Sequence, residues 1–277
     1  MQSVIRARTV LLILICWAMA NVLLYCGLEW YESSKLSVKH RPSRQSLALF
    51  EASLNHSIST EVAKRSALPY RLMSSAKTKS GERYPLVVFL HGAGEKGDDN
   101  QAQLLGLPEQ MAEAGWRKRF PCFLLAPQCP TQSYWTNLDD EMIGLIREVM
   151  ERQPIDPERV YLTGLSMGGF GCWALAAKEP ELFAAVVPIC GGGDPASASR
   201  LAKIPIWAVH GDADLAVPVE QSRTMIAAIR EAGGKPNYTE LKGVEHNSWT
   251  QTYRDPNGVL KWMFEQRNRR ATDSTVP

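Results

Sequence analysis

The chain has 277 residues, which is enough for one large domain or two small ones. Hydrophobic residues make up 45% of it, charged residues make up 22%, and the formal net charge is +2. This near-neutral balance predicts no nucleic-acid partner, because nucleic-acid-binding domains usually carry a strongly basic surface.

The N-terminus carries an apolar run from Val10 to Leu28, in which Asn21 is the only strongly polar residue. Nineteen residues of this kind are just long enough to span a hydrocarbon core of about 30 Å as a helix. Arg6 and Arg8 precede the run and predict that the following domain lies outside the membrane. Residues 10–28 are therefore a candidate membrane anchor.

A cleaved signal peptide is the competing interpretation, because Ala18 to Ala20 offer the small residues of a cleavage site. Both interpretations export the domain, which is either anchored outside the membrane or secreted or periplasmic after cleavage. We assign 1–30 to a signal peptide or anchor and the polar stretch 31–62 to a linker. One folded domain is expected over 63–270, followed by a tail over 271–277.

Five short runs in the folded domain are apolar throughout, which is typical of parallel strands covered by helices on both faces. These runs are Pro85–Leu90, Phe123–Ala126, Val160–Leu165, Ala184–Cys190 and Ile204–His210. Apolar residues at helical spacing predict helices over 139–152 and 219–232. A last strand near 238–241 and a helix over 259–266 close the domain. The alternation predicts an α/β fold with a mostly parallel central sheet.

Four cysteines lie in this domain: Cys122, Cys129, Cys172 and Cys190. Cys122 and Cys129 flank a predicted strand, which would separate their Cα atoms by roughly 23 Å. A disulfide requires a separation below about 7 Å, so these two cysteines cannot pair. The spacings do not resemble those of paired zinc ligands. We expect all four to be buried, reduced thiols.

Ser166 lies within Gly-Leu-Ser-Met-Gly, between a predicted strand and a predicted helix. In parallel sheets the chemistry takes place at the carboxyl ends of the strands, and this strand–turn–helix context is that of a nucleophile elbow. Gly164 and Gly168 would permit the sharp turn, and the helix N-terminus adds positive potential beside the serine. Ser166 is therefore the candidate nucleophile rather than an ordinary turn residue.

A serine nucleophile needs a base, and the base needs an acid that orients it. His246 follows the last predicted strand, in a loop that would return to the carboxyl edge of the sheet. Asp214 follows the strand that ends at His210, and Asp212 is a competing acid. The order Ser166, Asp214, His246 is one of the known chain orders of nucleophile, acid and base, and we favour Asp214 over Asp212.

The glycine-rich segment Leu90–Gly97 follows a predicted strand and can turn backbone N–H groups toward the serine. Acyl transfer needs such donors for the oxyanion, and we assign them to the N–H groups of Ala93 and Met167. His91 is expected to have a structural role in this loop. A phosphate-binding loop is excluded because the segment lacks the Gly-Lys-Ser/Thr ending.

Five motifs together resemble the α/β-hydrolase superfamily over about residues 68–267. They are FLHGAGEKGDDN, APQCP, YLTGLSMGGFGCW, VHGDADLAVPVEQSR and GVEHNSW. The chain is most similar to the small exported phospholipase/carboxylesterase (or predicted peptidase) branch, which is related to feruloyl esterases and polyhydroxybutyrate depolymerases. The resemblance implies the α/β-hydrolase fold and a serine hydrolase of carboxylic esters, with Ser166, Asp214 and His246 in the triad positions.

We therefore expect a serine carboxylesterase that acts through an acyl-enzyme and needs no metal or organic cofactor. Its substrate would be a small-molecule or polysaccharide-linked ester with a short-chain, acetyl-type or feruloyl acyl group. A serine peptidase of the prolyl-oligopeptidase type is the alternative. A non-catalytic binding protein with the same fold is a further rival, although such proteins usually lack a triad residue.

The predicted connection over 191–203 is too short to hold a large cap domain, so the sequence favours an open site. Trp135 follows a predicted strand and would form an aromatic wall for the substrate. Ordinary packing within its loop is the other interpretation of this tryptophan.

Overall fold

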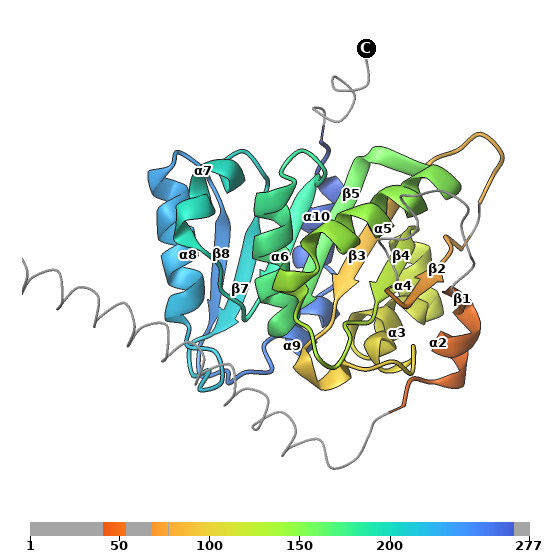
Figure 1. Ribbon diagram of the computed structural model, residues 1–277, viewed down its shortest axis with the longest axis horizontal. Helices are drawn as coiled ribbons and strands as arrows, with labels where there is room; N and C mark the ends of the chain where they lie inside the picture. The colour runs from red at the N-terminus through yellow and green to blue at the C-terminus, as the bar shows by residue number, and fades with distance from the viewer. Residues whose placement is uncertain (1–40, 54–67, 77, 269–277) are drawn as a thin grey trace, which may run out of the picture. The chain divides into compact units, whose positions relative to one another are not determined.

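The computed structural model describes residues 41–53, 68–76 and 78–268 (Figure 1). All described residues belong to one compact unit. Among the described residues, no helix is both long enough and apolar enough to cross a membrane. The predicted export segment lies outside the described residues.

The described strands form one eight-stranded sheet in the order β1-β2-β4-β3-β5-β6-β7-β8. Every neighbouring pair from β4 to β8 is parallel, whereas β2 runs antiparallel to both β1 and β4. The strands are β1 (Phe50–Ser53), β2 (Tyr70–Met73), β3 (Tyr84–Leu90), β4 (Phe123–Pro127), β5 (Ile155–Leu165), β6 (Ala185–Ile189), β7 (Trp207–Gly211) and β8 (Asn237–Leu241). The predicted mostly parallel α/β sheet is confirmed.

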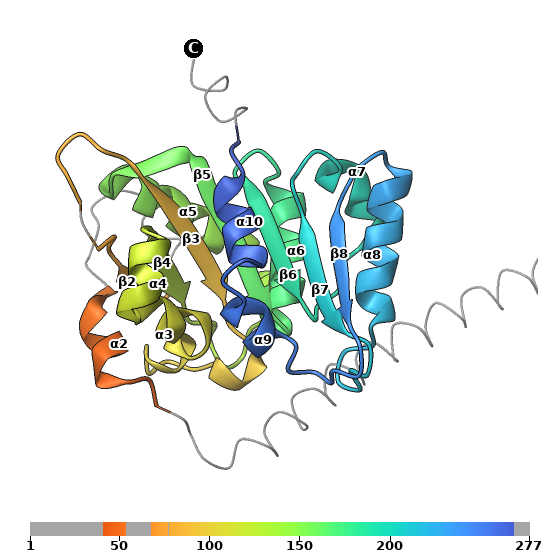
Figure 2. The same cartoon turned by 180° about the vertical axis from the view of Figure 1, so that it is seen from behind.

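Helices cover both faces of this sheet. Figure 1 shows α5, α6 and α8 in front of the strands, and Figure 2 shows α3, α4 and α10 on the opposite face. The helices are α2 (Arg44–Leu49), α3 (Leu107–Ala112), α4 (Ala114–Arg119), α5 (Asp139–Arg152), α6 (Met167–Lys178), α7 (Ala198–Leu201), α8 (Glu220–Glu231), α9 (Trp249–Arg254) and α10 (Val259–Glu265). Short 3-10 turns are η2 (Ala93–Glu95), η3 (Ala102–Leu104), η4 (Trp135–Asn137) and η5 (Pro195–Ser197).

The central strand β3 shows why the strands of this sheet are continuous apolar runs in the amino-acid sequence. Leu86 and Val88 pack into the core beneath α5, α6 and α8, whereas Val87 and Phe89 pack into the core beneath α3 and α10. Each of these four side chains is at most 1% exposed. Successive residues of a strand face opposite sides of the sheet, so a strand between two helical layers is apolar at every position.

The predicted linker over 31–62 is wrong for residues 44–53, which form α2 and β1, while its residues 31–40 and 54–62 lie outside the described residues. Ser43 caps α2 by accepting the backbone N–H of Ser46, at 3.1 Å from its Oγ, and β1 then joins the sheet edge. Phe50 of β1 is only 1% exposed and lies opposite Met73 of β2. The prediction failed because β1 is short and its partner strand lies farther along the chain, so no local periodicity reveals the pairing.

The connection between β6 and β7 contains only η5 and α7, so this described segment holds no cap domain, as predicted. The four cysteines of the domain are all buried and outside any disulfide, which confirms their expected state.

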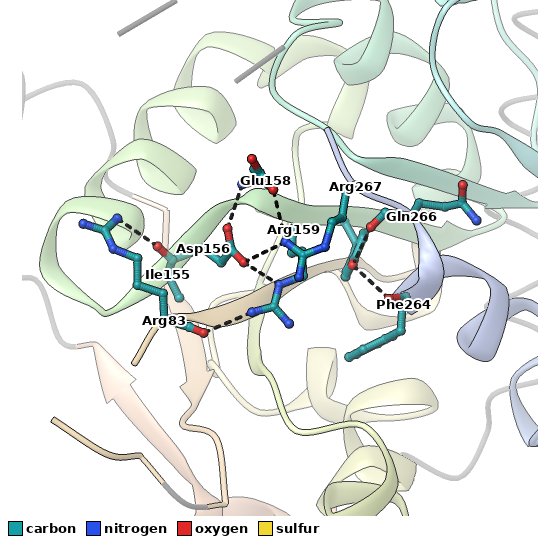
Figure 3. Close-up of polar contacts among 9 residues, drawn as sticks. Arg83, Ile155, Asp156, Glu158, Arg159, Phe264, Gln266 and Arg267 are labelled. Atoms are coloured by element: carbon teal, nitrogen blue, oxygen red, sulfur yellow. Dashed lines mark hydrogen bonds and ion pairs between the residues drawn. The ribbon is translucent and has the colours of Figure 1, made fainter. Parts of the chain in front are cut away.

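A polar network ties the amino end of β5 to the segment that follows α10 (Figure 3). Arg267 pairs with Glu158 at 3.1 Å and with Asp156 at 3.5 Å. Arg159 also pairs with Asp156 and donates to the backbone carbonyl of Arg83 at 3.1 Å. Partly exposed ion pairs contribute about 0–1 kcal/mol each, so this network mainly sets the course of the chain after α10.

The backbone of the first turn of α6 packs directly against the backbone at the end of β3, with no side chain between them. A Cβ atom at Gly168 would overlap the carbonyl oxygen of Leu90 and lie 2.8 Å from that of His91. A Cβ at Gly164 would lie 2.6 Å from the carbonyl oxygen of Gly168. Glycine at these two positions is therefore a steric requirement of the turn that carries Ser166.

Replacing Gly168 by alanine should lower the free energy of unfolding by about 1–3 kcal/mol or more, because the added methyl meets backbone that cannot move aside. The matched control is Gly144→Ala in the interior of α5, where an added Cβ meets nothing within 4 Å. That variant should gain roughly 0.5–1 kcal/mol from helix propensity. Denaturant unfolding followed by circular dichroism measures both, and equal stability of the two variants would contradict the steric argument.

Candidate active site

Ser166 lies at the turn between β5 and α6 with a backbone φ of 51° and ψ of −117°. A positive φ is rare for a residue with a side chain and is typical of tightly constrained functional turns. Its N–H donates to the carbonyl of Ile189 at 3.0 Å, which ties the turn to the end of β6. These contacts hold the Ser166 side chain in one place at the carboxyl edge of the sheet.

His246 lies between Ser166 and Asp214, so the structure brings together the three residues predicted from the sequence. Its Nε2 is 2.9 Å from Ser166 Oγ and its Nδ1 is 2.7 Å from Asp214 Oδ2. Because the carboxylate accepts, Nδ1 carries the proton and Nε2 offers a lone pair to the serine hydroxyl. This tautomer is the one in which an imidazole can act as a base toward Ser166.

Several hydrogen-bond donors point at the Asp214 carboxylate and hold it in its ionised form. Its Oδ1 accepts the backbone N–H groups of Ala216 and Val217, each at 2.9 Å. Burial raises the pKa of Asp214, but hydrogen bonds from His210, His246 and Val217 outweigh burial and hold the pKa well below its usual value.

The competing acid, Asp212, is placed differently. It is exposed, and its Oδ1 accepts the backbone N–H of Gly243 at 2.6 Å. The structure therefore positions Asp214, not Asp212, against the imidazole of His246.

A second histidine, His210, contacts the same carboxylate, a contact that was not predicted from the sequence. Its Nε2 lies 3.3 Å from Asp214 Oδ2 and 2.9 Å from the carbonyl oxygen of Val217. Because both neighbours are acceptors, Nε2 must carry a proton. Nδ1 lies 2.7 Å from Ser222 Oγ, which holds the ring in place. The available signal was a histidine at the end of a strand, four residues before the candidate acid.

The predicted oxyanion donors flank the serine. Met167 begins α6, Ala93 begins η2, and a Cβ at Gly92 would lie 3.8 Å from Ser166 Cβ, so the glycine-rich loop lies against the nucleophile. Neither N–H group donates to an acceptor among the described residues. Both are thus available to a ligand oxygen, and their role in oxyanion binding stays a prediction.

His91 fixes the glycine-rich loop, as expected. Its Nε2 accepts the N–H of Cys129 at 2.9 Å, so the ring proton is on Nδ1, which donates to the carbonyl of Gly92 at 2.6 Å. The ring is fully buried, and this burial together with the positive charge of Lys96 lowers the pKa of His91 to about 4.

Trp135 lies beneath this loop rather than on an open surface, where the substrate-wall prediction requires it. It is 2% exposed, and its indole N–H donates to the carbonyl of His91 at 3.0 Å. Its ring meets the His91 ring edge-on at 5.0 Å between centroids. Loop packing, the other interpretation, is the role that these contacts support.

The site is more enclosed than the missing cap suggested. Ser166 is 0% exposed and His246 is 6% exposed, so the expectation of an open site is wrong for this structure. Trp249 packs edge-on against the His246 ring, with centroids 5.3 Å apart, and so supports this ring from one side.

A cavity of about 410 Å³ lies between α2, α3 and α9, and Trp249 is one of its lining residues. It is lined by polar groups from Glu109, Glu113 and Arg254 as well as by the Trp249 ring. Ser166, Asp214 and His246, all of them described, are not part of its wall.

The buried, neutral His91 predicts an acid-sensitive stability. An unfolded histidine titrates near pH 6.5, so between pH 6.5 and about 4 the unfolded state binds a proton that the folded state does not. The free energy of unfolding should therefore fall as the pH drops through this window, by on the order of 3 kcal/mol from this residue. In His91→Gln the fall should be smaller, as measured by denaturant unfolding at pH 7, 5.5 and 4.5. Parallel pH dependence in the two proteins would refute the assignment.

Comparison with known proteins identifies the same fold as the structure does. The family model of the alpha/beta hydrolase fold matches residues 85–217. NocK of Nocardia uniformis subsp. tsuyamanensis is 28% identical over 194 residues, which are 64% of this chain and 54% of NocK. The chain thus spans about half the length of that curated relative.

Solved structures share the same architecture. A thermostable esterase is 38% identical, with a TM-score of 0.70 over 79% of this chain and 64% of the esterase. The acylaminoacyl peptidase of Pyrococcus horikoshii is 16% identical, with a TM-score of 0.60 over 80% of this chain and 42% of the peptidase, which shows the fold alone. The family match over residues 85–217, the sheet order and the similarity to these structures together show that the chain has the α/β-hydrolase fold.

Proposed function

We propose that this protein is a serine hydrolase that cleaves carboxylic esters through an acyl-enzyme. The observation that carries the proposal is the position of His246, whose two ring nitrogens meet Ser166 Oγ and the Asp214 carboxylate at 2.9 Å and 2.7 Å. The hydrogen-bonded order hydroxyl, imidazole, carboxylate is the arrangement that activates a serine as a nucleophile.

In the acylation step, Ser166 Oγ attacks the ester carbonyl while His246 Nε2 takes the hydroxyl proton. The negatively charged oxygen that forms would accept hydrogen bonds from the backbone N–H groups of Ala93 and Met167. The carboxylate of Asp214 stabilises the imidazolium through Nδ1–H and keeps the ring oriented. His246 then returns the proton to the leaving alcohol, and the acyl group remains on Ser166 as an ester.

In the deacylation step, a water molecule takes the place of the alcohol. His246 accepts a proton from this water, which attacks the acyl carbonyl, and the same two N–H groups donate hydrogen bonds to the oxyanion. The imidazolium returns its proton to Ser166 Oγ as the acid product leaves. The cycle uses side chains and backbone of this chain alone.

We propose a small-molecule ester as the substrate class, with a short-chain, acetyl-type or feruloyl acyl group, free or linked to a polysaccharide. The similarity to a thermostable esterase, at 38% identity, supports an ester over other acyl compounds. The enclosed position of Ser166, which has no exposed surface, supports a compact acyl group over a long one.

A serine peptidase of the prolyl-oligopeptidase type is the second candidate. Peptidases with this fold, such as the one from Pyrococcus horikoshii, support it through architecture alone. The same triad can attack an amide, so the choice between the two depends on the substrate that the enzyme turns over.

We also propose that the domain acts outside the cytoplasm, either anchored through residues 10–28 or released after cleavage of the first 30 residues. The support is the apolar run behind Arg6 and Arg8. Size comparison of the exported protein with the full chain would distinguish the two forms, because only cleavage shortens it.

The first test compares ester and amide hydrolysis by the full chain. Nitrophenyl esters of increasing acyl length, a feruloyl ester and peptide amides are offered to the wild type and to Ser166→Ala. We expect turnover of the short or feruloyl esters, little turnover of amides, and a loss of at least about a thousandfold in kcat on removal of the nucleophile. A preference for amides would favour the peptidase, and undiminished activity of the variant would exclude Ser166 as the nucleophile.

The second test concerns His210, which we propose acts through Asp214. Without its N–H group, Asp214 accepts the His246 proton more strongly, so imidazolium persists to higher pH. The acid limb of the kcat/KM profile should therefore shift to higher pH in His210→Phe, by roughly 0.5–1 pH unit for one lost hydrogen bond. His210→Gln can keep a donor near the Nε2 position and should shift less. An unshifted profile in both variants would limit His210 to a structural role.

A further inference from the structure

The thiol of Cys190 lies beside the triad but has no role in the mechanism above. Cys190 directly follows β6, is 0% exposed and forms no disulfide. Its backbone φ is 41°, a left-handed conformation that is rare for residues other than glycine. Its N–H donates to the carbonyl of Val209 at 2.9 Å, which fixes the residue between the ends of β6 and β7.

This placement brings three different metal-ligating groups together. The Cys190 Sγ, one carboxylate oxygen of Asp214 and one ring nitrogen of His246 all lie within 4.8 Å of one another. In a tetrahedral zinc site the bond lengths are about 2.0–2.3 Å, which separates neighbouring ligand atoms by roughly 3.5 Å. The three groups therefore need to approach one another by little more than about 1 Å to share one ion.

We propose that Cys190, Asp214 and His246 form a site for a thiophilic divalent cation, such as Zn²⁺ or Cd²⁺, and that the bound cation inhibits the enzyme. The inhibition rests on the proposed hydrolase function, whereas the binding does not. Thiolate, imidazole and carboxylate are the donor set that zinc prefers, and a fourth position remains for water or Ser166 Oγ. One carboxylate is too few oxygen ligands for Ca²⁺ or Mg²⁺, so these cations should not compete.

The charge and proton balance of binding is simple. A carboxylate binds a metal in its ionised form and an imidazole in its neutral form, and these are the forms in which Asp214 and His246 share a hydrogen bond here. Only the Cys190 thiol has to lose a proton, so one proton is released for each cation bound. The thiolate and the carboxylate together then neutralise the two positive charges of the ion.

Inhibition follows whichever ring nitrogen of His246 ligates the cation. If Nε2 binds, its lone pair is no longer available to the Ser166 hydroxyl. If Nδ1 binds, the ring proton must move to Nε2, which then donates to Ser166 Oγ at the 2.9 Å separation seen here. In both cases the base can no longer accept the serine proton.

The binding test uses the full chain with Ser166→Ala, which keeps all three ligands and needs no activity. Cd²⁺ is titrated in while the thiolate-to-cadmium ultraviolet absorption band and the released protons are recorded. We expect one equivalent of Cd²⁺ to produce the band and release one proton. Adding Cys190→Ser should abolish the band, whereas adding Cys122→Ser, which removes another buried thiol, should leave it intact.

A variant of a second ligand keeps the site testable if the cysteine variant does not fold. Ser166→Ala with His246→Gln retains the thiol but should bind Cd²⁺ at least tenfold more weakly. Circular dichroism establishes that each variant is folded. Absence of the band in Ser166→Ala, its persistence after Cys190→Ser, or unchanged affinity after His246→Gln would each overturn the site.

An activity assay tests whether the bound cation inhibits the enzyme. Zn²⁺ or Cd²⁺ should inhibit the wild type, and removal of the cation by a chelator should restore the activity. Cys190→Ser should require at least tenfold more metal for the same fractional loss of its own metal-free rate. Equal metal sensitivity of the two proteins would overturn the inhibitory role. If the wild type hydrolysed no substrate at all, the proposed function would fail while the Cd²⁺ titration would still decide the metal site.

Discussion

Backbone contact between the first turn of α6 and the end of β3 is the constraint on which the site depends. Only glycine at position 168 lets the helix come this close, because a side chain there would overlap the carbonyl of Leu90. The close approach places the start of α6 against the end of β3 and the glycine-rich loop that follows it. Ser166, with its positive φ, lies in the turn directly before this contact.

The Asp214 carboxylate is a second point on which the geometry of the site depends. It lies in a loop after β7 and is reached by two backbone N–H groups and by two histidines, one from β7 itself and one from the loop after β8. Burial opposes its charge, and the donors more than compensate. The Cys190 thiol, held at the end of β6, lies within 4.8 Å of a carboxylate oxygen of Asp214 and a ring nitrogen of His246.

Ser166 is buried without a cap domain over it. The β6–β7 connection is short, yet Ser166 has no exposed surface, because the loops at the carboxyl edge pack closely around it. His91 and Trp135 contribute from below by holding the glycine-rich loop through a chain of hydrogen bonds between the two loops. The shape available to a substrate is therefore set by loop packing rather than by an inserted domain.

The sequence by itself determined the α/β class, the runs that form β3 to β8 and the positions of Ser166, Asp214 and His246, because each depends on a local pattern or a short motif. Tertiary structure decided the rest. The pairing of β1 with β2, the contact of His210 with Asp214, the place of Cys190 and the burial of Trp135 all join residues from different elements. Contacts of this kind form only when the sheet assembles, so no periodicity or spacing along the chain can reveal them.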